Sequence, residues 1–92
     1  MIVRISAENQ YRLDDEVLAR VNELDNAAVA AVDAGDRDAF HHNFNELLAL
    51  VRSKGTPLHD DDLSVSDVIL PPDDLSFEEA GQEFTGEGLI PD

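Results

Sequence analysis

Two apolar stripes with helical spacing, separated by one Gly-Asp pair, constrain the fold of this chain more than any other feature. The stripes are Val17, Val21, Leu24, Ala28 and Ala31, followed by Phe40, Phe44, Leu47 and Val51. Spacings of three and four place each stripe on one face of a helix. Gly35 suits the left-handed residue that ends a helix, and Asp36 suits the N-cap of the next helix. Helices joined so closely must lie antiparallel.

The outer ends of this helical hairpin carry capping signals as well. Asp14 is a good N-cap for the first helix, and Leu13 and Leu18 hold the two positions of a hydrophobic staple. Lys54 suits the negative end of the second helix, and Gly55 follows it at the C′ position. Both helices therefore have defined starts and ends in the sequence.

Two short strands are expected before the helices. Residues 2–5 are mostly β-branched, residues 10–13 alternate polar and apolar side chains, and Glu8-Asn9 supplies a turn. A two-stranded ribbon is marginal in water by itself, so it should pack on the helices. The predicted fold class is α+β: an N-terminal β-hairpin packed on an antiparallel helical hairpin, followed by an irregular acidic tail with a short helix.

The chain changes character after the second helix. The sequence at 76–79 fits a capping box, which predicts a short helix over 77–84 that Gly81 weakens. We expect a single domain in which residues 1–54 form the body and residues 55–92 form an acidic tail. Because apolar residues recur along this tail, it should dock either on the body or on a partner.

The net charge of −15 is unevenly placed. Up to Lys54 there are 10 acids and 6 bases, which gives −4, and from Gly55 onward there are 11 acids and no Lys or Arg, which gives −11. Nucleic acids and anionic membranes bind clustered bases, so neither is an expected partner. The charge favours a basic partner surface. The same acidity could instead serve solubility or adaptation to high salt. Charge alone does not decide between these general explanations and a specific basic partner.

The chain carries no segment that would be expected to enter a membrane. No stretch approaches the roughly 20 apolar residues that span a bilayer, and the apolar start over residues 1–6 is too short for a signal peptide. The expected location is the cytoplasm.

No residue pattern points to catalysis, a metal site or a cofactor. The chain has no cysteine, no G-x-S-x-G serine and no Gly-rich loop with a Lys. His41 and His42 are adjacent on a helix, so their side chains point about 100° apart. His59 precedes a contiguous run of acids, and the acids over 33–38 lack the alternation and distal Glu of a calcium loop. We therefore expect no enzyme and no cofactor.

Short segments distributed along nearly the whole chain carry a family resemblance. They read MIVRI, QYRL, DDEVL and NELDN in the first 26 residues, and then AGD, LLALVR, GTPL, SDVILPP and EGLIP. In order and spacing these segments resemble the PspAA family, the PspA-associated proteins of actinobacterial and archaeal phage-shock systems. Gly81 in the tail helix and the pair His41-His42 depart from the pattern expected of that family.

The resemblance implies a small adaptor without catalytic activity. Its partner would be phage-shock protein A (PspA), a long coiled-coil, membrane-remodelling protein of the envelope-stress response. Such coiled coils often carry basic stretches because they meet anionic membranes, so an acidic module would dock there and compete with lipid. The protein would then reach the inner face of the cell membrane only through its partner.

Residues of the tail are the candidates for partner binding. The apolar candidates are Leu70, Phe84, Leu89 and Ile90, and the acidic candidates are Asp60, Asp61 and Asp62. No catalytic or metal-binding residue is proposed.

Three other functions compete with the adaptor. An acidic nucleic-acid mimic or antirepressor would bind a basic protein, although it would need acids spaced along a rigid surface. A minimal metal-dependent enzyme would use His59 and the acids after it. A self-association module would pair the Val17–Ala31 stripe with a second copy, and a homodimer is compatible with work as an adaptor.

Overall fold

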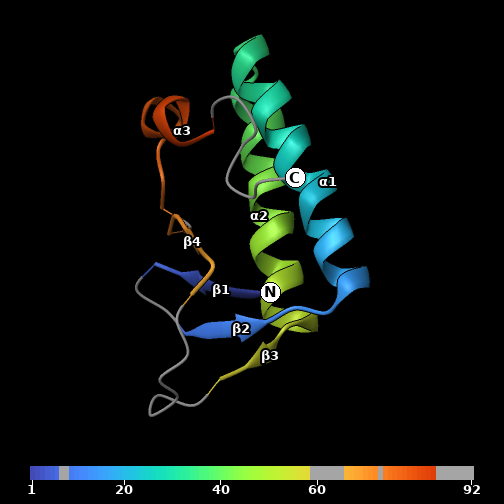
Figure 1. The fold of residues 1–92 in the computed structure, drawn as a ribbon. Helices are drawn as coiled ribbons and strands as arrows, with labels where there is room; N and C mark the ends of the chain where they lie inside the picture. The colour runs from blue at the N-terminus through green and yellow to red at the C-terminus, as the bar shows by residue number, and fades with distance from the viewer. Residues whose placement is uncertain (7–8, 59–65, 73, 85–92) are drawn as a thin grey trace.

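The computed structural model describes residues 1–6, 9–58, 66–72 and 74–84. The strands are β1 (Ile2–Ile5), β2 (Gln10–Arg12), β3 (Thr56–Pro57) and β4 (Val68–Leu70), and the helices are α1 (Asp15–Ala34), α2 (Arg37–Lys54) and α3 (Phe77–Glu83). Figure 1 shows α1 and α2 side by side as a hairpin, with the strands near one end and α3 beside the other. The predicted α+β fold is confirmed, including the short third helix.

The helical hairpin begins and turns at the predicted capping residues. The side chain of Asp14 accepts a hydrogen bond from the backbone N–H of Val17 at 2.9 Å. Gly35 has a φ of 70°, which is the left-handed conformation, and Asp36 accepts from the N–H of Ala39 at 3.1 Å. One helix therefore ends and the next begins within two residues, which fixes the antiparallel arrangement.

Gly55 ends α2 for a different reason from Gly35. Its backbone is extended, with a φ of −72°, so no left-handed conformation is required there. A Cβ added at this position would lie 2.5 Å from the carbonyl oxygen of Val51 and 3.0 Å from the Cβ of Tyr11. Glycine is needed because the last turn of α2, and to a lesser degree β2, lies too close for a side chain.

The sheet contains two strands that the sequence prediction did not include. Its order is β3-β2-β1-β4, in which β1–β2 and β2–β3 are antiparallel and β1–β4 is parallel. Both added strands come from the segment that was expected to be an irregular tail. They are two and three residues long, below the length at which alternation in a sequence indicates a strand.

Hydrogen bonds at both ends of β4 hold it against β1. The N–H of Ser6 donates to the carbonyl of Leu70 at 2.8 Å, and the N–H of Asp67 donates to the carbonyl of Ile2 at 2.8 Å. The Asp67 carboxylate also accepts from the N–H of Ile2 at 2.9 Å. A carboxylate of the acidic segment is thus used to attach that segment to the N-terminal strand.

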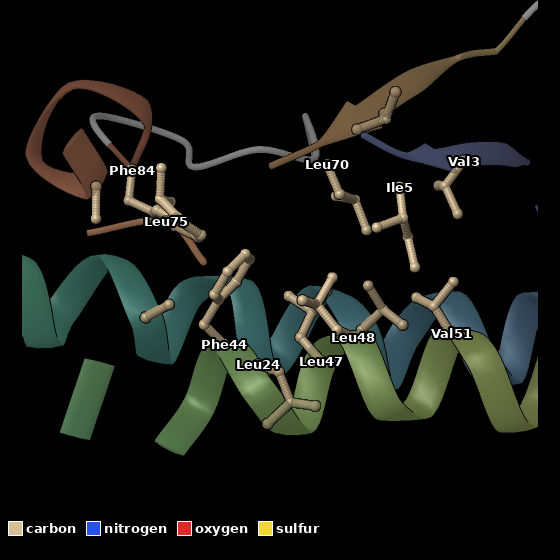
Figure 2. Packing of buried hydrophobic residues seen from close by; sticks show 14 of the residues in the cluster. Val3, Ile5, Leu24, Phe44, Leu47, Leu48, Val51, Leu70, Leu75 and Phe84 are labelled. Carbon is tan, nitrogen blue, oxygen red and sulfur yellow. The ribbon is translucent and has the colours of Figure 1, made fainter. Parts of the chain in front are cut away.

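The core lies between the helical hairpin on one side and the sheet with the C-terminal segment on the other. All residues of the two predicted stripes are buried except Val17, which is half-buried. Figure 2 shows side chains of the sheet, among them Ile5 and Leu70, facing Leu48 and its neighbours on α2. Leu75 and Phe84 extend the same layer toward α3. Segments from both sides of the predicted body–tail boundary share this core.

Two glycine substitutions are expected to change stability in opposite directions. Gly55→Ala should lower the free energy of unfolding by about 1–3 kcal/mol, because the new methyl group overlaps the Val51 carbonyl. Gly81→Ala should raise it by about 0.5–1 kcal/mol, because Gly81 lies in α3 with nothing within 4 Å of an added Cβ. Urea unfolding followed by circular dichroism measures both. Equal stability of the two variants would contradict this account of Gly55.

Candidate partner-binding surface

Two of the apolar residues predicted to bind a partner lie in the core of the chain itself. Leu70 and Phe84 are both 0% exposed. The Phe84 ring packs edge-on against the rings of Phe40 and Phe44, with centroids 5.1 and 5.5 Å apart. Such contacts between aromatic rings stabilise beyond the area that they bury. A partner would reach Leu70 or Phe84 only after the C-terminal segment separated from the helices.

The other predicted partner-binding residues lie outside the described part of the chain. These residues are Asp60, Asp61, Asp62, Leu89 and Ile90, and the candidate metal ligand His59 lies outside it as well. Their part in partner binding stays a prediction.

The third helix is attached to α2 by side chains as well as by the core. Arg37 donates to Glu78 at 3.1 Å, and its guanidinium lies 5.4 Å from the centre of the Phe77 ring. Ser76 and Glu79 form the predicted capping box at the start of α3. The Arg37–Glu78 pair is well exposed, so its own contribution to stability is small. The position of α3 relative to the hairpin is held mainly by its buried residues Ala80 and Phe84.

A groove of about 380 Å³ opens where β4 leaves the sheet and the chain continues to α3. Its lining is made by Ser6, Ile69, Leu70, Pro71, Pro72, Asp74, Leu75 and Glu79. Leu70 and Leu75 are buried beneath it, whereas Asp74 and Glu79 are exposed carboxylates. Because both leucines are buried, the exposed lining of the groove is mostly polar and includes these two carboxylates.

Ile69 is the most exposed large aliphatic side chain in the described part of the chain, at 64%. It points away from the core because its neighbours Val68 and Leu70 point inward, and side chains alternate along a strand. On the outer face of the sheet it lies beside Arg4 of β1, which is also exposed. Ile69 thus lies beside Arg4 in the sheet and also lines the groove that contains the two carboxylates.

Sequence reasoning did not find this groove. Ile69, Asp74 and Glu79 come together only because β4 joins β1 and α3 packs on the helices, and both contacts are remote in sequence. The available signal was the alternation of the short run at 68–70 immediately before two prolines. That run implies one outward side chain and a chain that cannot continue as a strand.

The described residues offer no grouping that would support metal chemistry. Among them, no cluster of three or more His, Asp or Glu side chains is placed to hold an ion. His42 pairs with Glu46 at 3.2 Å on the exposed face of α2, and His41 lies edge-on to the ring of Phe40. These contacts account for both histidines as helix-surface residues.

Comparison with protein-family models tests the family resemblance that the sequence segments suggested. The model described as PspAA, PspA-associated protein, matches residues 1–92. The chain belongs to the PspAA family. Comparison with curated proteins and with solved structures gives no match. Within the described residues, no helix has the length and apolar character needed to cross a membrane.

The contacts among Phe40, Phe44 and Phe84 should contribute strongly to the stability of the fold. We expect Phe84→Ala to lower the free energy of unfolding by about 3–5 kcal/mol, because it removes a buried ring that contacts Phe40 and Phe44. Phe77→Ala is the matched control, since Phe77 is only partly buried and should cost less. Thermal unfolding by circular dichroism compares the variants. If Phe84→Ala were as stable as wild type, Phe84 would be available to a partner without any loss of the fold.

Proposed function

We propose that this protein is a non-catalytic adaptor that binds the coiled-coil, membrane-remodelling protein PspA in the envelope (phage-shock) stress response. The observation that carries the proposal is the match of the PspA-associated family model to residues 1–92. The family description names association with PspA, and the adaptor role extends that description to this chain.

The charge of the protein supports a basic partner. The chain carries −15 in 92 residues, with a base-free stretch after Lys54. A coiled coil that meets anionic lipid needs basic stretches, and an acidic domain is steered toward such stretches over distances up to a Debye length. Lipid and adaptor would then compete for the same bases. The adaptor would be membrane-peripheral through its partner alone.

The described acids fit the adaptor better than a nucleic-acid mimic. A mimic needs regularly spaced carboxylates that are free to meet a basic protein. In the described part of the C-terminal segment, Asp67, Glu78 and Glu79 each accept hydrogen bonds from groups of the same chain. Asp67 and Glu78 fasten the segment to the sheet and to α2, and Glu79 caps α3.

Binding to the PspA-like protein of the same organism should be direct and sensitive to salt. We expect the Kd to rise about tenfold or more between about 0.05 and about 0.5 M NaCl, because screening weakens attraction between exposed charges. Isothermal titration calorimetry with both purified proteins measures the Kd. An unrelated acidic protein of similar size and charge is the control for non-specific attraction. Absence of binding at the lower salt concentration would refute the adaptor.

A further inference from the structure

We propose that α3 occupies the surface on which a helix of the partner coiled coil docks, and that this helix takes the place of α3 when the two proteins bind. The proposal rests on the proposed adaptor function and names the surface that it would use. It follows from the apolar spacing of α3, from the aromatic surface beneath α3, and from how little of the sequence of α3 favours a helix.

The apolar residues of α3 have the spacing of a helix that docks in a groove. Phe77, Ala80 and Phe84 lie at positions i, i+3 and i+7, from the first residue of α3 to the residue that ends it. Ala80 and Phe84 are completely buried, and Phe77 is partly buried. Amphipathic helices that enter apolar grooves are anchored at these spacings, and coiled-coil helices repeat them. The position of α3 therefore indicates the class of ligand that this surface accepts, which is an amphipathic helix.

The surface beneath α3 is aromatic and belongs to α2. The Phe40 ring packs edge-on against Phe77 and Phe84, with centroids 5.9 and 5.1 Å apart. The same ring stacks on Phe44 at 5.6 Å, and Figure 2 shows Phe44 pointing from α2 toward the segment that carries Phe84. Loss of α3 without a replacement would expose apolar area of both α2 rings to water, which is unfavourable. A helix with apolar side chains at the same spacing restores that burial.

Arg37 adds an electrostatic preference at the edge of this surface. It donates to Glu78 at 3.1 Å, and its guanidinium lies 5.4 Å from the centre of the Phe77 ring. Because the ion pair is exposed, another carboxylate can replace Glu78 at little cost. A docking helix that carries an acid next to an aromatic anchor keeps both contacts of Arg37. Glu78 is then free to meet a base of the partner.

The sequence of α3 favours a helix only weakly apart from its capping box. Its seven residues are too few to form a stable helix without outside contacts, and its last turn has no base. Gly81 lies inside α3 although nothing comes within 4 Å of an added Cβ and its φ is not positive. Neither crowding nor backbone conformation therefore requires glycine there, and glycine lowers the stability of the docked helix.

The attachment of β4 does not depend on α3. The last hydrogen bond between β4 and the N-terminal strand segment is made by the carbonyl of Leu70, before Pro71 and Pro72. The capping box of α3 begins only at Ser76. The helix can therefore separate from α2 while β4 stays paired with β1.

The first test uses the reactivity of a single thiol to measure whether the partner displaces α3. The chain has no cysteine, so Ala80→Cys places the only thiol on the buried side of α3. We expect its rate of reaction with iodoacetamide to rise about tenfold or more at saturating PspA-like protein, because ligands shift a protein toward the state that they bind. Val21→Cys, at a buried position of α1, is the control and should not react faster.

Thermal unfolding verifies that both cysteine variants are folded, and calorimetry verifies that they bind the partner. An unchanged or slower reaction of the Ala80→Cys variant in the complex would overturn the exchange and leave the adaptor standing.

The second test changes no buried residue. Gly81→Ala strengthens the docked helix with which the partner competes, so we expect the Kd of the PspA-like protein to rise about two- to fivefold. Asn26→Ala is the matched control, since it also raises helix propensity at an exposed position, here in α1, and should leave the Kd within about 1.5-fold. Isothermal titration calorimetry measures both. Equal Kd values for the two variants and wild type would overturn the exchange, and absence of wild-type binding would overturn the adaptor as well.

A second copy of the chain is the other occupant that these measurements detect. Exchange of α3 between two copies would give a dimer in sedimentation and would make the reaction of the Ala80→Cys thiol depend on protein concentration without any partner. That result would overturn the assignment of the surface to a partner coiled coil. A monomer whose thiol reacts at a rate independent of protein concentration supports it.

Discussion

The parallel pairing of β4 with β1 is the contact on which the rest of the structure depends. It places Leu70 in the core next to Ile5, and it starts the path that brings Leu75 and Phe84 over the helices. Without it the N-terminal hairpin would have one free edge and the helices would expose Phe40 and Phe44. A small domain has little stability to spare, so a three-residue strand can decide whether the core is complete.

Local signals were sufficient to predict the helices. Asp14, Gly35 and Asp36 act within one turn of their own positions, and the caps are observed where the sequence placed them. The buried faces of both helices could also be predicted, because each follows from the spacing of apolar residues within a single helix. Val17 is only half-buried because it lies in the first turn of α1, at the margin of the core. Capping and periodicity therefore predicted the hairpin and most of its core.

The sheet edges and the groove could not be predicted in the same way. Pro57 and Thr56 form a strand only because β2 is beside them, and Ile69 is exposed only because β1 fixes the register of β4. Such pairing depends on residues more than forty positions away, which no local pattern encodes. The same limit applies to the burial of Leu70 and Phe84, which depends on contacts with strands and helices remote in the sequence. Their part in partner binding stays a prediction.

The order of the strands also affects how the protein can fold during synthesis. The helical hairpin is complete at Lys54, but the strand that closes the sheet and the ring that covers Phe40 come only at 68–84. Until that last segment leaves the ribosome, an aromatic surface on α2 stays uncovered. Nascent chains with such surfaces depend on chaperones or on early partners. Completion of the core therefore waits until residues 68–84 have been synthesised.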